Sequence, residues 1–162
     1  MNTSDINRPL GTLFRELLNG APRSTSSYML NRGDAGLLAS LDRLSAASAS
    51  AGSEGGTSIA AHVEHLRYGL SLMNRWAAGE DPFSTADWSA SWRRSVVSDP
   101  EWSELRRHLA DEGERWLANL QTPRDVEEVE LNGLIASIAH LAYHLGAIRQ
   151  IDRATRGPAA ND

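Results

Sequence analysis

A stripe of apolar residues, spaced alternately by four and three positions, runs through residues 59–77 of the chain. Its members are Ile59, Val63, Leu66, Leu70, Met73 and Ala77. This spacing places all of them on one face of an α-helix, as in the seam between two packed helices. Thr57 or Ser58 can cap the start of this helix, and Gly79 marks its end. The stripe therefore predicts a long helix that buries one face against neighbouring helices.

Helical spacing of apolar residues predicts four further helices, over residues 5–18, 34–47, 98–122 and about 130–154. Asp34 is a candidate N-cap for the second of these helices. Ser98 and Glu101 can form a capping box at the start of the third. Residues 21–33, 45–57 and 81–97 contain the Pro, Gly or Ser residues typical of connections, and 45–57 is expected to be a flexible link.

Long helices joined in this way predict an all-α fold. We expect a four-helix bundle formed by residues 34–154, with an additional short helix within residues 1–20. A chain of 162 residues suits a single domain, and residues 155–162 are expected to form a frayed tail. The chain contains no Cys, so the fold needs no disulfide, and any metal would have to be bound by His, Asp or Glu.

The composition narrows the classes of partner. The net charge is −5 and all 16 basic residues are Arg, without a basic stripe, which argues against nucleic acid as the main partner. Residues 1–8 are polar and lack the apolar core of a signal peptide. Residues 131–148 carry no formal charge but include two His and two Gly, which favours a buried helix over a membrane span. A cytoplasmic protein without a membrane partner is therefore expected.

Four of the five His residues lie on the two most apolar predicted helices, His62 and His65 on one, His140 and His144 on the other. Side chains four residues apart stack on one face of a helix, so His140 and His144 can point at a common position. A third His from a facing helix would complete a three-nitrogen site with open coordination positions, as in metal sites that handle a substrate. At about 100° per residue, all four lie beside the apolar seams, which predicts a site at the rim of the bundle.

Ordinary explanations also exist for these residues. A His pair at this spacing arises by chance, but residues 130–149 are otherwise apolar, and a buried imidazole without a partner costs about 1–3 kcal/mol. Metal binding would supply a partner for both rings. His108, four residues after Glu104, is expected to be a surface ion-pair partner, and Trp76 is expected to pack in the core rather than line a cleft. Gly146 can either admit a close backbone approach or merely weaken its helix.

Two segments of the chain resemble the DinB/YfiT-like superfamily of metal-binding four-helix bundles. They are Ser58-Ile-Ala-Ala-His-Val-Glu-His-Leu66 and His140-Leu-Ala-Tyr-His-Leu-Gly-Ala-Ile-Arg149. The family pattern is a His before a Leu on the second bundle helix and H-x-x-x-H-x-G-x-I on the fourth. The similarity covers about residues 34–153 and is specific in these two segments. It implies that His65, His140 and His144 are the metal ligands.

The resemblance also implies one divalent metal ion, zinc or nickel first and iron next, and often a homodimer. Some relatives are similar in fold to transferases and isomerases that use a low-molecular-weight thiol such as mycothiol or bacillithiol. The leading hypothesis is therefore a metal-dependent transferase or isomerase in which a cofactor thiol attacks a small-molecule electrophile. His62 would either support a ligand or carry a proton. Arg67 or Arg149 could contact an anionic cofactor, although a solvated Arg is the more common case.

Two alternatives remain open. Some relatives are described as metal-dependent hydrolases, and hydrolysis of a small amide or ester would need a general base that no H-E-x-x-H pattern supplies. Glu64 adjoins His65 but points about 100° away from it on a helix. The other alternative is a non-catalytic, stress-related helical bundle with a structural metal. Because a protonated His cannot bind a metal, binding is expected to weaken below about pH 6.

Overall fold

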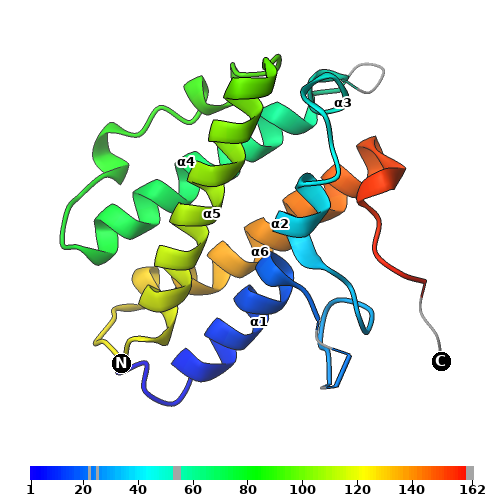
Figure 1. Ribbon diagram of the computed structural model, residues 1–162. Helices are drawn as coiled ribbons and strands as arrows, with labels where there is room; N and C mark the ends of the chain where they lie inside the picture. The colour runs from blue at the N-terminus through cyan, green and yellow to red at the C-terminus, as the bar shows by residue number, and fades with distance from the viewer. Residues whose placement is uncertain (22, 25, 53–55, 160–162) are drawn as a thin grey trace.

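The fold is all-α, as the spacing of apolar residues predicts (Figure 1). A computed structural model describes residues 1–21, 23–24, 26–52 and 56–159. Its helices are α1 (Asn7–Asn19), α2 (Gly36–Leu41), α3 (Ala46–Ser50), α4 (Ile59–Ala77), α5 (Asp99–Gln121) and α6 (Glu128–Ile151). Three short 3₁₀ turns are η1 (Phe83–Thr85), η2 (Ala90–Trp92) and η3 (Arg153–Thr155). The described residues contain no β-strand.

Side-chain caps explain where α4 and α5 begin. At the start of α4, the Ser58 hydroxyl accepts a hydrogen bond from the Ala61 N–H at 3.3 Å. At the start of α5, the Glu101 carboxylate accepts from the Ser98 N–H at 2.8 Å and from the Ser98 hydroxyl at 2.6 Å. These bonds satisfy groups that a helix terminus otherwise leaves unpaired. Both predicted helix starts are confirmed.

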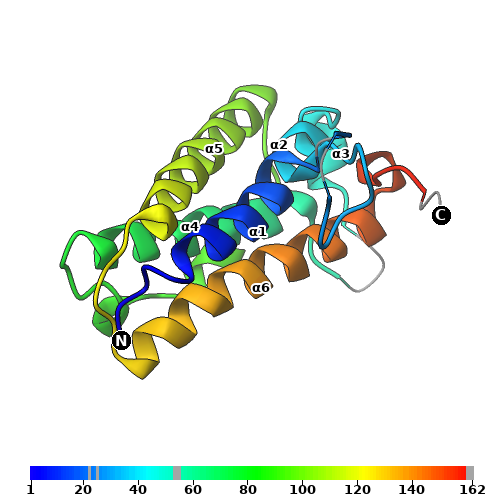
Figure 2. The same cartoon turned by 90° about the horizontal axis from the view of Figure 1, so that it is seen from below.

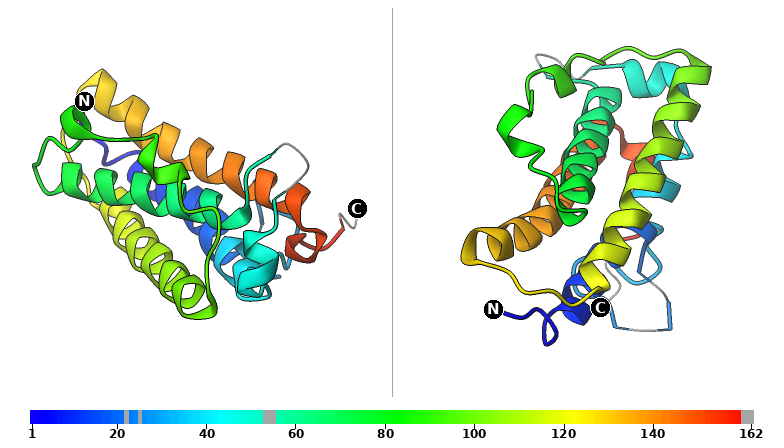
Figure 3. Two further views of the ribbon diagram at one scale, coloured as in Figure 1. Left: turned by 90° about the horizontal axis from the view of Figure 1, so that it is seen from above. Right: turned by 90° about the vertical axis from the view of Figure 1, so that its left-hand side faces the viewer.

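The four longest helices run in two opposite directions. α4 and α5 run the same way: Ser58, at the start of α4, donates to the Ser95 carbonyl at 2.6 Å, and near their far ends Asn119 donates to the Asn74 side chain at 3.0 Å. α1 and α6 run opposite to this pair (Figure 2). Residues 78–98 therefore have to cross back along the length of α4 before α5 begins (Figure 3). This crossing places η1 and η2 beside α4.

α1 belongs to the central core. It packs against α5 and α6 and almost completely buries Phe14, Leu17 and Leu18. Gly113 of α5 permits this contact, because a Cβ at that position would lie 3.0 Å from the Leu18 side chain. The prediction of an extra helix outside a core of residues 34–154 is therefore wrong about the role of α1, whose apolar stripe helps to enclose the core that α4, α5 and α6 share.

The predicted single helix over residues 34–47 is also corrected. The structure has two short helices here, α2 and α3, and α3 lies inside the segment expected to be a flexible link. The Ser45 hydroxyl starts α3 by accepting from the Ser48 N–H at 3.1 Å, so a capping residue interrupts the apolar periodicity. The predicted N-cap at Asp34 is also wrong: the N-cap of α2 is Ala35, which makes no side-chain cap bond, although the Asp34 carboxylate accepts from the Gly36 N–H at 2.9 Å. Residues 53–55 of the predicted link lie outside the described residues.

The C-terminal helix differs from its prediction at both ends. α6 begins at Glu128, where the Glu127 N–H donates to the Glu130 carboxylate at 2.7 Å, and it ends at Ile151. The chain then forms η3, at whose start the Asp152 carboxylate accepts a hydrogen bond from the Ala154 N–H at 2.8 Å. Thr155 in η3 is fully buried, so the frayed tail predicted for residues 155–162 is wrong at its start. Residues 160–162 lie outside the described residues.

Among the described residues, α6 is the one helix long and apolar enough to cross a membrane, judged by length and composition alone. Its inner face contributes Leu134, Ile138, Leu141, Leu145 and Ile148 to the core. Its outer face leaves Ile135 and Tyr143 exposed by 51% and 68%. The inner face is what a packed core helix requires, and the absence of a membrane partner stays a prediction.

Candidate metal centre

Three His side chains, one from α4 and two from α6, meet between these antiparallel helices. The His140 Nε2 atom lies 3.1 Å from His65 Nε2 and 2.9 Å from His144 Nε2. The three rings can offer one nitrogen each within 4.8 Å of one another. His65 and His144 are buried and His140 is half-buried. The structure thus brings together the three residues singled out in the sequence, in a cluster that could hold a metal ion.

A hydrogen bond with Ser91 of η2 determines which ring nitrogen of His65 carries the proton. The Ser91 hydroxyl donates to the Trp88 carbonyl at 2.7 Å, so its oxygen must accept from His65 Nδ1, which is also 2.7 Å away. The Nδ1 atom of His65 therefore carries the proton, and Nε2 is left as a bare lone pair. Metal-binding imidazoles are commonly oriented by a hydrogen bond of this kind at the other ring nitrogen.

His62 contacts the cluster through the ring of His144. Its Nδ1 atom lies 2.8 Å from Nδ1 of His144, on the side of that ring opposite His140. The His62 ring also packs edge-on against Trp92, with ring centroids 5.3 Å apart. His62 is therefore placed to orient His144 rather than to join the three converging nitrogens. Of the two roles left open for this residue, its position fits the supporting one.

The donor set of the cluster fits a cation. Because His65 Nε2 carries no proton, His140 Nε2 must donate to it if that 3.1 Å contact is to be a hydrogen bond. The same proton cannot also serve the 2.9 Å contact between His140 and His144. With all three rings neutral, at least one of the two contacts of His140 Nε2 therefore cannot be a hydrogen bond. A tetrahedral ion would hold its nitrogens about 3.3 Å apart at bond lengths of about 2.0–2.1 Å, close to the spacings of 3.1 Å and 2.9 Å that His140 makes with His65 and His144.

All the rings of the site are neutral at pH 7. Burial, reinforced by the neighbouring imidazoles, lowers the pKa of His144 to about 3 and that of His65 to about 4. Burial also lowers the pKa values of His62 and His140. Each neutral ring keeps a lone pair that can bind a metal ion. Protons should therefore compete with a metal for His65 and His144 only well below about pH 6, the value at which the sequence predicts that binding weakens.

Aromatic side chains from the crossing segment enclose the cluster. The Trp92 ring stacks on His65, with centroids 4.2 Å apart and planes 21° from parallel, and Trp88 packs against the same ring at 5.7 Å. Tyr143 of α6 meets His144 edge-on at 5.0 Å. No local sequence pattern links Ser91 or Trp92, which lie in a connection, to a His on the preceding helix, so their place in the site could not be predicted from the sequence.

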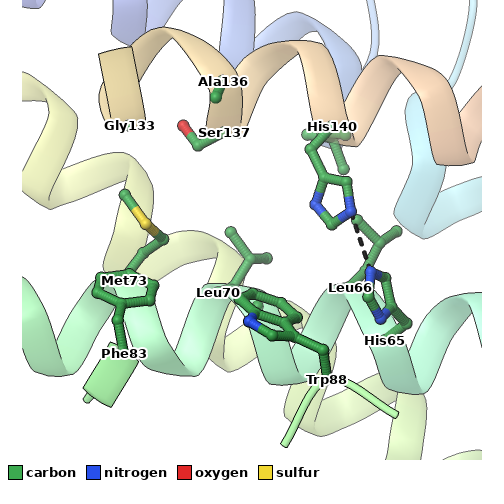
Figure 4. Close-up of a pocket in the computed structure, with 12 residues that line it drawn as sticks. His65, Leu66, Leu70, Met73, Phe83, Trp88, Gly133, Ala136, Ser137 and His140 are labelled. Carbon is green, nitrogen blue, oxygen red and sulfur yellow. Dashed lines mark hydrogen bonds between the residues drawn. The ribbon is translucent and has the colours of Figure 1, made fainter. Parts of the chain in front are cut away.

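A pocket of about 440 Å³ opens directly beside the cluster, between α4 and α6. His65 and His140 line one end of it, and Met73, Phe83 and Gly133 lie toward the other (Figure 4). The position agrees with the predicted site at the rim of the helices, open to a cleft. A metal bound by these His residues would therefore be reachable by a small molecule.

The comparisons with known proteins add no relative. No family model, curated protein or solved structure matches the chain. The likeness to DinB/YfiT-like bundles accordingly depends on the two segments that contain the His residues.

The two Arg residues considered for an anionic cofactor are both engaged by carboxylates. Arg67 pairs with Glu64 at 2.6 Å, and Glu64 also lies 3.7 Å from Arg94. Arg149 pairs at 2.7 Å with Asp34, and both side chains are largely buried. Neither Arg67 nor Arg149 lines the pocket, and Glu64 does not belong to the group of residues that could hold the ion.

Three other residues behave largely as expected. His108 is exposed as expected, but its Nε2 atom accepts from Arg107 at 2.8 Å and lies 3.9 Å from Glu104, so Arg107 rather than Glu104 is its hydrogen-bond partner. Trp76 packs against Trp116, with ring centroids 6.3 Å apart, and does not line the pocket beside the cluster. At Gly146, no atom lies within 4 Å of where a Cβ would stand, so no close approach explains this glycine.

Removing the Ser91 hydroxyl is expected to weaken metal binding. A Ser91→Ala variant leaves His65 Nδ1 without its acceptor, so the ring loses the bond that selects its tautomer and orientation. Loss of such a partner lowers metal affinity by about 10–100-fold. Titration against a chromophoric chelator measures the change. Ser89→Ala is the matched control, because the Ser89 hydroxyl donates to exposed Asp87; equal affinities of the two variants would contradict the role of Ser91.

The metal-free protein is expected to lose stability as the pH falls from 7 to 5.5. In the unfolded chain His65 and His144 regain ordinary pKa values near 6.5, so they bind protons as the pH falls below 7. In the folded protein they stay neutral over this range, because their pKa values are about 4 and about 3. Each such residue lowers the free energy of unfolding by up to about 1.4 kcal/mol per pH unit within this window. Urea unfolding at several pH values measures the slope. His144→Leu should flatten it, whereas His108→Gln should not; the reverse would contradict the assignment.

Proposed function

We propose that this protein binds one divalent metal ion through Nε2 of His65, His140 and His144, and that it is a metal-dependent transferase or isomerase using a small thiol. The observation that supports a catalytic rather than a structural ion is the pocket, because His65 and His140 form part of its lining. Structural metal sites are closed by protein ligands, whereas catalytic sites keep a position open to the substrate. Zinc and nickel are the leading candidates for the ion.

A divalent ion held by three neutral imidazoles keeps its full charge and lowers the pKa of a thiol bound to it. The chain has no Cys, so the thiol would come from a small molecule. Its sulfur would bond to an electrophilic carbon of the substrate, whose leaving group departs with the bonding electron pair, while the thiol proton passes to solvent. The protein's part is to hold the neutral rings through Ser91 and His62 and to limit water access with Trp88 and Trp92.

Hydrolysis of a small amide or ester receives less support from the site. Such a reaction benefits from a general base within reach of the attacking water. The carboxylate nearest in sequence, Glu64, is paired with Arg67 and Arg94. Among the described residues grouped as possible metal ligands, only the three His residues occur, without a carboxylate. Thiol transfer does not require a general base from the protein, because a metal-bound thiol has a lowered pKa and loses its proton to solvent.

The finer features of the family resemblance are part of the same proposal. We assign α1, α4, α5 and α6 as the helices of a DinB/YfiT-like four-helix bundle, supported by their shared core. A homodimer, a small-molecule substrate, the absence of nucleic acid and a cytoplasmic location stay predictions. None of them is needed for the metal site itself.

The function is tested with protein analysed for metal as purified and then loaded with zinc or nickel. We expect one ion per chain, and turnover of a small electrophile only when both metal and thiol are present. Chelator-treated protein with the same thiol is the control for the uncatalysed reaction. Turnover of an ester or amide without thiol would overturn the transferase proposal in favour of a hydrolase. Substoichiometric metal after loading at neutral pH would overturn the ligand assignment.

A further inference from the structure

The pocket beside the His cluster differs sharply in character from the cluster itself. It extends between α4 and α6 from His65 and His140 to Met73 and Gly133 (Figure 4). Its volume of about 440 Å³ lies within the range of small-molecule sites, about 300–1,000 Å³. Among the described residues, no Asp, Glu, Lys or Arg lines it.

The hydroxyl group of the lining away from the cluster is already satisfied. Ser137 is the hydroxyl residue of the lining: its O–H donates to the Leu134 carbonyl at 2.7 Å, and its oxygen accepts from the Trp116 Nε1–H at 3.0 Å. A ligand therefore gains little by replacing these bonds. Beyond the His end and the Trp88 indole N–H, the pocket offers mainly contact with apolar atoms and the release of water from them.

Small residues keep the space between the helices open. A Cβ at Gly133 would lie 3.8 Å from Met73 Cε, and one at Gly69 would lie 3.7 Å from both the His140 and Trp88 rings. These are ordinary contact distances, so a methyl group would be accommodated, but a longer side chain would have to occupy the pocket. Together with Ala136, these glycines leave a narrow space between the two helix surfaces.

Two aromatic side chains from the crossing segment border this space. Phe83 and Trp88 line the pocket, yet they are exposed by 42% and 43%. Large aromatic side chains that stay this exposed beside an apolar cavity are typical of a binding site, because a ligand completes their burial. Their flat rings favour a flat partner.

We propose that this pocket binds an uncharged aromatic group, with any polar atom of the ligand directed toward His65 and His140. Its use as the substrate site rests on the proposed function, whereas the binding of the aromatic group does not require a metal. The ligand class follows from a lining without charges, a satisfied Ser137, the space left at Gly133 and the exposed rings of Phe83 and Trp88.

The test uses metal-free full-length protein and two probes of the same shape, naphthalene and 2-naphthoate, in ligand-detected NMR. We expect naphthalene to bind and 2-naphthoate to bind at least about tenfold more weakly, because no charged side chain compensates the desolvation of its carboxylate. Gly133→Leu should abolish naphthalene binding by filling the pocket. Gly146→Leu is the matched control on the same helix, since its side chain points into open space, and it should bind as the parent protein does.

Equal or tighter binding of 2-naphthoate, or unchanged naphthalene binding in Gly133→Leu, would overturn the proposal. A second measurement separates it from the proposed function. With cobalt-loaded protein, the visible spectrum should report 4-phenylimidazole binding at least about tenfold tighter than imidazole, as burial of the phenyl ring predicts. Failure to load cobalt together with retained naphthalene binding would overturn the metal-dependent function and support the aromatic site. Equal affinity for the two imidazoles would count against that site.

Discussion

A His140→Ala variant should lose metal binding almost completely. His140 Nε2 is the central atom of the cluster, since it contacts both other Nε2 atoms, at 3.1 Å and 2.9 Å. Removing it leaves two ligands on different helices. We expect the affinity to fall by more than the roughly 100-fold that the loss of a supporting hydrogen bond can cause. Elemental analysis after loading and dialysis, with chelator competition, measures the loss.

His108→Ala is the matched control for this substitution. His108 is exposed on α5 and contacts Arg107 and Glu104 rather than the cluster, so its removal should leave metal content and affinity unchanged. Because His140 is only half-buried, the fold of the metal-free His140→Ala variant should be retained, which circular dichroism verifies. Unchanged affinity in a folded His140→Ala protein would show that the three rings do not form the site.

An Arg149→Met variant should be destabilised by about 3–5 kcal/mol, the cost of leaving one charge of a buried pair uncompensated. The pair joins α6 to the segment before α2: Arg149 Nη2 lies 2.7 Å from Asp34 Oδ1, and the two side chains are only 16% and 2% exposed. Asp34 would then keep a buried negative charge with the Gly36 N–H as its remaining partner. Chemical unfolding of the metal-free protein measures the change.

Two further variants make this result specific. Asp34→Asn combined with Arg149→Met removes both charges, and it should recover a large part of the lost stability. Arg75→Met breaks the pair between Arg75 and Glu80, two side chains that are each about half exposed. It should lower the free energy of unfolding by less than about 1 kcal/mol. A double variant as unstable as Arg149→Met alone would argue that the packing of the Arg149 stem, and not its charge, is what matters.

The features that depended on neighbours in the sequence could be predicted from it. The apolar stripe of α4 and the caps at Ser58 and Ser98 involve residues three or four apart, and helix geometry alone relates such residues. The same geometry placed His140 and His144 on one face. Periodicity failed where capping competed with it, as at Ser45, and it could not distinguish a core helix from an added one for α1.

The sequence by itself determined that the chain is helical and that two helices carry His residues suited to one ion. Only the tertiary structure decided how that site is completed. Residues 78–98 have to return along α4, and this path brings Ser91 and Trp92 onto His65, 26 residues away for the hydrogen bond. Likewise, the Arg149–Asp34 pair spans 115 residues. Such contacts depend on the course of the whole chain and on the choice of rotamers, which no local spacing encodes.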